Sequence, residues 1–347
     1  MDLALEHFFA QLHWAWLALA IAAGLYVLGR SADWLVDEAV ALSERSGVPK
    51  AIIGATIVSL GTTTPEAAVS VFAAVQGSPG LALGNAVGSI ICDTGLILGL
   101  ACVLAPLKLN RKIVNRQGWI QFSAGVALVL ACLPWTGLGH LFDTGGRLHQ
   151  VTGFVFLAAL VLYMVQSIRW ARQEANARMV EDHERDVSAP LPWMVAKLVM
   201  ATALVVASAR FLIPAAAEAA ARLHVPESII AATLVAFGTS LPELMTAVTA
   251  ARRGHGDLAV GNVVGADILN VLFVAGAAAA VTPVGLAAGA HFFIVLFPVM
   301  LVILGVFRIG VFLSGKYLER PFGFVLLGVY ACYLLISYLL PGGPGNF

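Results

Sequence analysis

Long apolar runs alternate with short polar stretches along the whole chain. Each run has about the 20 residues that a helix needs to cross a bilayer. The runs predict ten membrane-spanning helices, at 12–40, 50–76, 80–105, 118–136, 149–170, 191–221, 226–251, 257–281, 289–310 and 322–340. The composition agrees, because 60% of the 347 residues are hydrophobic and only 12% are charged, whereas soluble domains carry about a quarter charged residues. The sequence therefore predicts an all-α polytopic membrane protein.

The basic residues are distributed unevenly between the polar stretches. The odd-numbered loops hold most of them, including a cluster within 108–116, whereas the even-numbered loops hold only Arg147 and Arg222. By the positive-inside rule the odd loops face the cytoplasm and both termini face outward. Lys+Arg and Asp+Glu balance at 20 each and no basic run occurs, which argues against a nucleic-acid partner. We expect the lipid bilayer as the surrounding medium and find no sign of an obligatory protein partner.

The chain contains an internal repeat. Residues 48–106 align without a gap with residues 225–283, and both copies contain GTxxPE followed by LAxGNxVG. The most hydrophilic stretch, 173–190, separates a first half (1–172) from a second half (191–347) and is expected to be a cytoplasmic connector. Each half has five spans, so the second half must enter the membrane from the opposite face. The prediction is two inverted five-helix repeats, the architecture of many secondary transporters.

Two acidic residues lie at equivalent positions deep inside predicted spans. Glu66 and Glu243 each have more than a turn of apolar sequence on both sides. Ionised carboxylates at this depth are expensive and mark ion or substrate pathways. Each follows a proline, Pro65 or Pro242, that removes a helix hydrogen bond. We expect an unwound point there, with carbonyl oxygens turned toward a cation.

Further oxygen donors share the faces of these acids. They are Thr62 and Thr63 before Glu66, Thr239 and Ser240 before Glu243, Ser89 and Asp93 in span three, and Asp267 and Asn270 in span eight. The glycines nearby, Gly84, Gly88, Gly261 and Gly265, would let the helices approach closely. No His or Cys joins the set, and hard oxygen donors with several carboxylates suit Ca²⁺ or Na⁺ rather than zinc or copper.

With these motifs the chain resembles the cation/calcium exchanger superfamily, in particular the bacterial members of its sodium/calcium exchanger branch. The resemblance implies a multi-pass protein of a bacterial inner or plasma membrane that exchanges Ca²⁺ for Na⁺ by alternating access. It implies no enzyme activity and no cofactor beyond the transported ions. By position, it implies a Ca²⁺ and central site of Thr62, Glu66, Asp93, Thr239, Glu243 and Asn270, and Na⁺ sites completed by Thr63, Ser89 and Ser240 with the carbonyls of Ser59 and Ala236.

The chain departs from that family pattern in two ways. Ala266 stands where a sodium-ligating serine is common, and Asp93 and Asn270 hold the acid and the amide in the opposite halves from some members. Thr62 and Thr239 stand where the proton-coupled branch typically has Asn, which favours sodium. A proton-coupled antiporter of the same fold is the nearest alternative. A cation channel is a second, and an intramembrane hydrolase has no supporting motif.

A group of charged residues marks the end of span one. Asp33, Asp37, Glu38 and Glu44 lie there with Arg30 and Arg45 nearby. We interpret them as an interfacial charge network, with a cytoplasmic vestibule as the alternative. The four cysteines lie in apolar runs, where they act as small hydrophobic residues.

Overall fold

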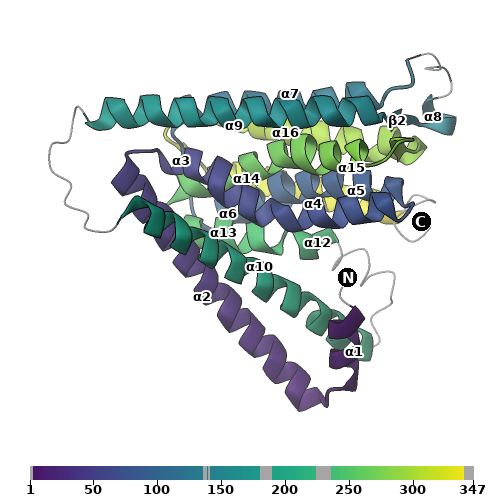
Figure 1. Ribbon diagram of the computed structural model, residues 1–347, viewed down its shortest axis with the longest axis horizontal. Coiled ribbons are helices and arrows are strands. Elements are labelled where there is room, and N and C mark those ends of the chain that lie inside the picture. The colour runs from purple at the N-terminus through teal and green to yellow at the C-terminus, as the bar shows by residue number, and fades with distance from the viewer. Residues whose placement is uncertain (1–2, 136–138, 140, 180–189, 224–235, 340–347) are drawn as a thin grey trace.

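The computed structural model describes residues 3–135, 139, 141–179, 190–223 and 236–339 (Figure 1). The described part is almost entirely helical, and α marks α-helices, η π-helical segments and β strands. The first half comprises α1 (Leu3–Gln11), α2 (Trp14–Ser46), α3 (Lys50–Ile53), η1 (Gly54–Val58), α4 (Ser59–Val75), α5 (Pro79–Ile90), η2 (Ile91–Leu98), α6 (Gly99–Leu104), β1 (Leu107–Lys108), α7 (Arg111–Cys132), α8 (Leu141–Thr144), β2 (Gly146–Leu148) and α9 (Gln150–Met179).

The second half follows the same order of long helices. It comprises α10 (Leu191–Arg222), α12 (Ala236–Thr239), α13 (Leu241–Arg252), α14 (Gly256–Leu269), η5 (Asn270–Ala275), α15 (Gly276–Ala280), β3 (Leu286–Ala288), η6 (Phe292–Leu296), α16 (Phe297–Leu313), β4 (Tyr317–Leu318) and α17 (Arg320–Leu339). Most of the predicted connector and the start of the seventh predicted span, residues 226–235, lie outside the described residues.

Eight helical segments of the described chain are long and apolar enough to cross a membrane. The expectation of an all-helical membrane protein is thus confirmed, while the predicted spans 118–136 and 226–251 are not among those eight. The helix α7 begins at Arg111, seven residues before the predicted span, so its first turns carry charge. Of the predicted span 226–251, the described part consists only of α12 and α13, each shorter than a membrane crossing.

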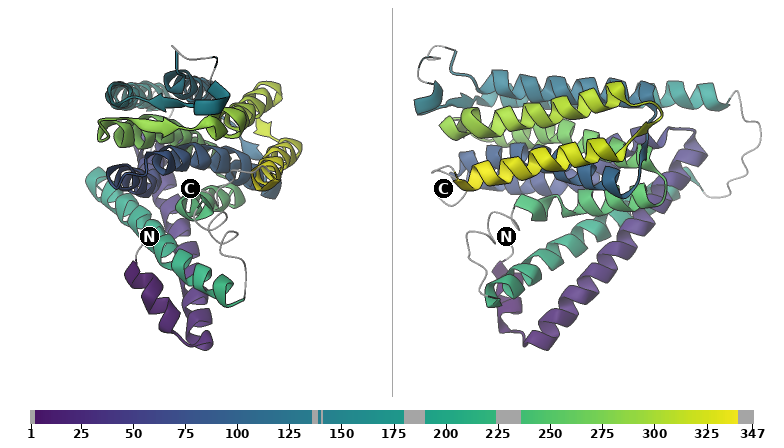
Figure 2. Two further views of the ribbon diagram at one scale, coloured as in Figure 1. Left: turned by 90° about the vertical axis from the view of Figure 1, so that its right-hand side faces the viewer. Right: turned by 180° about the vertical axis from the view of Figure 1, so that it is seen from behind.

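Two long helices are set apart from the others. The helices α2 and α10 occupy equivalent places in the two halves, pack along one another and cross the long axis of the molecule obliquely (Figure 1). Figure 2 shows from two further sides that the remaining long helices form a separate stack, in which α7, α9 and α16 run roughly parallel. The side chain of Leu212 on α10 fills the space beside Gly24 on α2.

The helix α14 lies at the centre of that stack, and all its residues except Asp257 are buried. It crosses α3 and η1 at very short range, because a Cβ atom added to Gly261 would lie 2.3 Å from the carbonyl oxygen of Ala51. One added to Gly265 would lie 2.5 Å from the Cα of Ala55. The prediction that these glycines permit close packing is confirmed for α14. Among described residues, no backbone comes comparably close to Gly84 or Gly88.

The two prolines differ in their effect on the helix. The helix α4 continues through Pro65 from Ser59 to Val75, so the expected unwound point is wrong in the first half. In the second half the helix is interrupted at Ser240, between α12 and α13. Instead, the chain widens into π-helical segments at η1, η2 and η5, and such segments are frequent at functional sites.

Two short antiparallel ribbons tie the halves together. The strand β1 pairs with β4, with Leu107 opposite Leu318, and β2 pairs with β3, with Leu148 opposite Leu286. Each ribbon joins the segment that follows the repeat core of one half to the segment before the last long helix of the other. The sequence did not predict these strands, because each has only two or three residues.

Candidate functional site

The two predicted glutamates both lie in the interior, where α4 and α13 face each other. Glu66 and Glu243 are each 1% exposed, and their carboxylates are close enough to repel each other electrostatically. A direct contact links the halves, because Thr63 Oγ1 donates a hydrogen bond of 3.4 Å to Glu243 Oε1. The structure thus brings together the two GTxxPE motifs, which are 177 residues apart in the chain.

The acid and amide of the second motif also meet across the two halves. Asn270 Nδ2 donates to Asp93 Oδ2 over 3.4 Å, and both side chains are 1% exposed. Asp93 belongs to η2 and Asn270 opens η5, so a widened turn presents each of them. Asp93 lies close enough to Glu243 for their charges to repel. The four side chains therefore form one buried group.

The predicted hydroxyl donors surround this group. Thr62 Oγ1 donates to the carbonyl oxygen of Ser59 over 3.3 Å, and its side chain lies next to Glu243. The side chain of Ser240 lies next to Asp93. Ser89 is 2% exposed on α5. Of the remaining predicted donors, Thr239 ends α12 and Ala236 begins it, and the side chain of Ala236 lies outside the described residues.

Many oxygen atoms of this group have no hydrogen-bond partner. They are Glu66 Oε2, Glu243 Oε2, Asp93 Oδ1, Asn270 Oδ1, and the hydroxyls of Ser89, Thr239 and Ser240. Buried polar atoms are almost always paired in folded proteins, so a concentration of unpaired acceptors indicates a position for a cation. Within the described segments, no three His, Cys, Asp or Glu side chains converge as a conventional metal cluster. The donors are mixed, with carboxylate, amide and hydroxyl oxygens, and this mixture suits Na⁺ or Ca²⁺.

Several polar residues near the group escaped the sequence analysis. Asn85 of the GN motif donates to the Glu66 carbonyl oxygen over 3.4 Å and to Ser70 Oγ over 2.9 Å, so it fixes α5 against α4. Gln121 on α7 reaches Asp267 with its Nε2 atom over 2.5 Å. A signal existed in the sequence, because Gln117 and Gln121 stand four residues apart and so share one face of α7.

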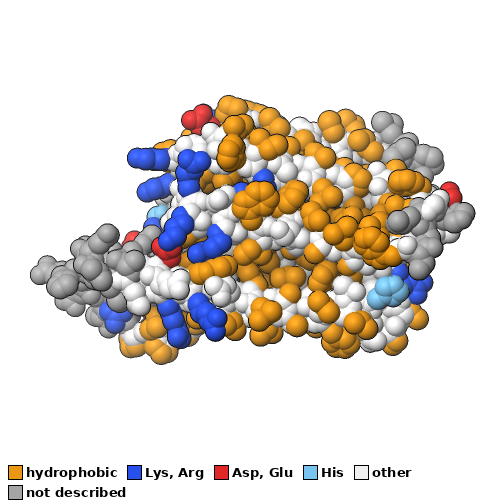
Figure 3. Space-filling model, turned by 90° about the horizontal axis from the view of Figure 1, so that it is seen from above, with side chains coloured by type: hydrophobic (Ala, Val, Ile, Leu, Met, Phe, Trp, Pro, Cys, Tyr) orange, Lys and Arg blue, Asp and Glu red, His pale blue; other side chains and the backbone are white. Residues whose placement is uncertain are grey.

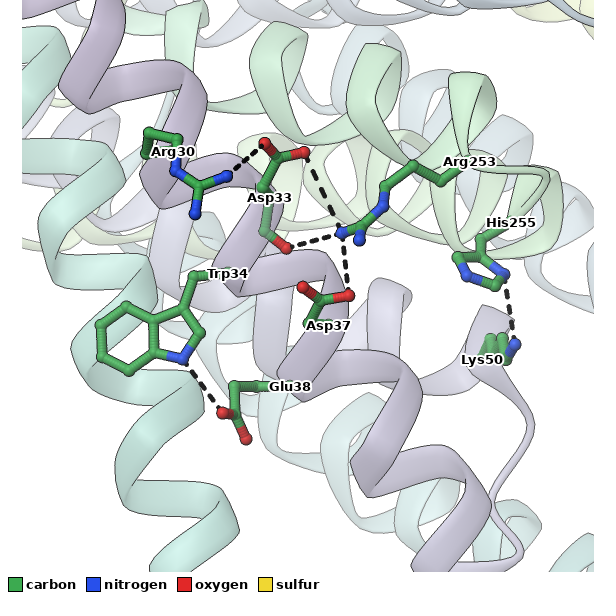
Figure 4. A network of polar contacts seen from close by, with 8 residues as sticks. All are labelled: Arg30, Asp33, Trp34, Asp37, Glu38, Lys50, Arg253 and His255. Carbon is green, nitrogen blue, oxygen red and sulfur yellow. Dashed lines mark hydrogen bonds and ion pairs between the residues drawn. The ribbon is translucent and has the colours of Figure 1, made fainter.

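The predicted charge network at the end of span one is confirmed, and it reaches other helices. Arg253 Nη1 contacts Asp37 Oδ1 over 2.8 Å and the Asp33 carbonyl oxygen over 3.0 Å, which ties the end of α13 to α2 (Figure 4). Glu38 accepts a hydrogen bond from Trp34 over 3.0 Å and pairs with Lys197 of α10 over 3.4 Å. These ion pairs brace α2, α10 and α13 at one end of the molecule.

A second polar contact lies beside that network. His255 lies in the turn between α13 and α14, and its Nδ1 atom is 3.2 Å from Lys50 Nζ at the start of α3 (Figure 4). Partial burial lowers the pKa of His255, and the positive charge of Lys50 lowers it further. A neutral His255 can therefore accept the hydrogen bond that the Lys50 ammonium donates.

All four cysteines are free thiols, and Cys92, Cys102 and Cys132 are buried. The thiol of Cys102 donates to the carbonyl oxygens of Leu318 and Glu319.

Comparisons with known proteins agree with this picture. Residues 16–169 and 193–339 match the family described as "Sodium/calcium exchanger protein". The chain is 31% identical to "Sodium/calcium exchanger MaX1" of Methanosarcina acetivorans, over 93% of this chain and 98% of that protein. It is 35% identical to "Inner membrane protein YrbG" of Escherichia coli, over 75% and 78%. A structure of the sodium-calcium exchanger NCX_Mj has the same fold, with a TM-score of 0.76 and 24% identity over 93% of this chain and 99% of that one.

Proposed function

The chain belongs to the sodium/calcium exchanger protein family, and from that premise we propose that it is a secondary antiporter that exchanges Ca²⁺ for Na⁺ across a membrane. The observation that carries the proposal is the meeting of Glu66 and Glu243, from equivalent positions of the two halves, in a buried group of unpaired oxygen atoms. One such group can hold one divalent ion between two carboxylates or distribute several monovalent ions among the same donors.

Exchange follows from the charge of this group. Glu66, Glu243 and Asp93 are buried, and no Lys or Arg of the described chain forms an ion pair with them. Keeping carboxylates in the membrane interior without a bound cation costs about several kcal/mol for each charge while the site changes its side of access. An ion-free site is therefore the least favourable state in which to change the side of access. Because Ca²⁺ and Na⁺ need the same glutamates, each displaces the other, and transport of one requires counter-transport of the other.

We assign the individual roles by position. Thr62, Glu66, Thr239 and Glu243 would hold Ca²⁺, with Asp93 and Asn270 beside it. Thr63, Ser89 and Ser240, with the carbonyl oxygens of Ser59 and Ala236, would complete the Na⁺ sites. The carbonyl oxygen of Ser59 accepts a hydrogen bond from Thr62, so it lies beside one of these donors.

The proposed architecture is ten spans in two inverted five-helix repeats, 48–106 and 225–283 being the cores. The two ribbons support it, because they are built in the same way with the halves interchanged. In β1–β4 the strand after the repeat core comes from the first half, and in β2–β3 it comes from the second half. Alternating access would then arise from movement of one group of helices against the other.

We further propose that both termini face outward and that the connector, 173–190, is cytoplasmic. Lys and Arg side chains gather mainly at one end of the face that Figure 3 shows, and hydrophobic side chains cover the band beyond them. That distribution is the one the positive-inside rule associates with the cytoplasmic side.

The decisive experiment is Ca²⁺ uptake into proteoliposomes loaded with Na⁺ and diluted into Na⁺-free buffer. We expect uptake under the Na⁺ gradient, none under an equal K⁺ load, and none under a proton gradient alone. Uptake driven by the proton gradient would instead indicate the proton-coupled alternative. Uptake without any counter-ion gradient would indicate a channel.

Three variants accompany this assay. Glu66→Gln and Glu243→Gln should each abolish uptake while the protein still elutes as a folded species. The matched control is Thr64→Val, because Thr64 is exposed and its hydroxyl donates only to the Leu60 carbonyl oxygen of its own helix. Full uptake in either glutamate variant would contradict the proposed site.

A further inference from the structure

A fourth buried carboxylate lies beside the proposed site. Asp267 stands on α14 one turn before Asn270 and is 1% exposed. Its Oδ2 atom accepts hydrogen bonds from Thr94 of η2 and from Gln121 Nε2 of α7. The equivalent position of the first repeat is Ile90, so this carboxylate breaks the symmetry between the halves.

The side chains around Asp267 leave oxygen atoms unused. Asp267 Oδ1 and Gln121 Oε1 have no hydrogen-bond partner, although both side chains are at least 98% buried, with exposures of 1% and 2%. Gln121 also donates to Thr94 Oγ1 over 3.1 Å, so the three side chains form one connected cluster, which we call the Asp267 cluster. It draws on three elements of both halves, and none of its members is among the proposed Ca²⁺ or Na⁺ donors.

The cluster lies in the interior of the described helices, because Asp267, Thr94 and Gln121 are each at most 2% exposed. No Lys or Arg in the described segments forms an ion pair with Asp267, so its charge lacks a counter-charge from the protein.

Counting charges indicates what the cluster lacks. Glu66, Glu243, Asp93 and Asp267 together bring four negative charges into the interior, and one Ca²⁺ offsets two of them. Asp267 is close enough to Asp93 for their charges to repel. A second cation near Asp267 would remove this repulsion. A single carboxylate with two neutral oxygens is a smaller donor set than the six to eight oxygens, several of them carboxylate, that Ca²⁺ takes, so the cluster matches a monovalent ion.

We propose that Asp267, Thr94 and Gln121 form an additional binding site for a monovalent alkali cation, occupied by Na⁺ during exchange. The proposal rests on the exchanger function proposed above and adds a site to it. Asp267 Oδ1 supplies the charge, while Thr94 Oγ1 and Gln121 Oε1 supply neutral oxygens. Half a turn of the Gln121 amide exchanges Nε2 for Oε1, so this side chain can donate to the free carboxylate or turn its oxygen to the ion.

The test combines a binding count with a transport curve, both on the full chain. Equilibrium binding of radioactive Na⁺ to the purified protein gives the number of bound ions. Ca²⁺/Ca²⁺ exchange in proteoliposomes, which needs no Na⁺, reports whether the proposed Ca²⁺ site is intact. Na⁺-driven Ca²⁺ uptake at fixed high pH gives the Na⁺ concentration at half-maximal rate and the Hill coefficient.

We expect Asp267→Asn to bind one Na⁺ fewer and to retain Ca²⁺/Ca²⁺ exchange. Its Na⁺ curve should have a lower Hill coefficient and a half-maximal Na⁺ concentration at least about tenfold higher, since a charged ligand is lost. Gln121→Leu keeps the carboxylate and should give a smaller change in the same direction. The matched control is Gln117→Leu, one turn earlier on α7, whose amide oxygen instead accepts from Tyr163 over 3.1 Å.

Three outcomes would overturn the proposal. The first is an unchanged Na⁺ count and curve in Asp267→Asn with Ca²⁺/Ca²⁺ exchange intact. The second is an effect of Asp267→Asn on the pH dependence alone, which would make the cluster a proton site. The third is an equal change in Gln117→Leu, which would indicate disturbed packing of α7. Failure of the exchanger function itself is distinguishable, because the wild-type protein would then show no Na⁺-driven uptake.

Discussion

The contact between Asp93 and Asn270 predicts that the two residues can exchange their roles. They lie in equivalent positions of the two halves, 3.4 Å apart, and both are 1% exposed. In the double variant Asp93→Asn with Asn270→Asp, the carboxylate moves only across this contact, and the central site keeps its charge. In Asp93→Asn alone, the charge is removed. We therefore expect the single variant to lose Ca²⁺ affinity and the double variant to regain most of it.

The size of the loss can be worked out from the geometry. A carboxylate and a Ca²⁺ ion about 4 Å apart interact by about 8 kcal/mol at an effective dielectric constant of about 20. The variant also avoids the cost of burying one carboxylate, which offsets part of this energy. A net loss of about 2–4 kcal/mol corresponds to Ca²⁺ binding weaker by roughly 30- to 800-fold. The double variant should lie within about tenfold of the wild type, a difference of about 1.4 kcal/mol.

The assay is the Ca²⁺ concentration dependence of exchange in proteoliposomes at saturating Na⁺ gradient, with size-exclusion elution and circular dichroism as controls for folding. The single variant Asn270→Asp is the control, because it adds a carboxylate without removing Asp93. It shows how much of the effect in the double variant comes from added charge alone. If the double variant is folded and binds Ca²⁺ no better than Asp93→Asn, the two positions do not face the same ion, and the reasoning is refuted.

Three further predictions concern other parts of the molecule. Gly265→Ala should lower the free energy of unfolding in detergent by about 1–3 kcal/mol, because the new Cβ would lie 2.5 Å from the backbone of the facing helix. The control is Gly305→Ala, whose new Cβ would have no described atom of another element within 4 Å. Equal stability of the two variants would contradict the packing argument. Ala266→Ser adds a hydroxyl to the buried face of α14 and should raise the apparent Na⁺ affinity by up to about tenfold; an unchanged Na⁺ curve would show that no ion lies beside this residue. Lys50→Met should raise the pKa of His255, since it removes the neighbouring positive charge; an NMR titration of the imidazole that shows no upward shift would contradict the contact.

Several properties of the protein can be read from the sequence by itself. Hydropathy and the spacing of charges along the chain are local properties, and they predicted the long helices and the charge network beside Asp33 and Asp37. The repeat is visible by aligning the chain with itself, and it singled out Glu66 and Glu243 as equivalent buried acids. Bilayer thickness fixes span length, and the cost of a buried charge makes an intramembrane acid conspicuous. For these features no knowledge of packing was needed.

Other properties were decided only by the tertiary structure. The sequence showed Asp267 as an added acid, but its contacts with Thr94 and Gln121 depend on how three helices are rotated and how deep each lies. The proline at position 65 predicted a break, yet α4 continues through it from Ser59 to Val75. Arg253 reaches α2 because α13 ends beside it. Side-chain pairing between helices depends on rotation, depth and crossing angle, and packing of the whole bundle sets all three.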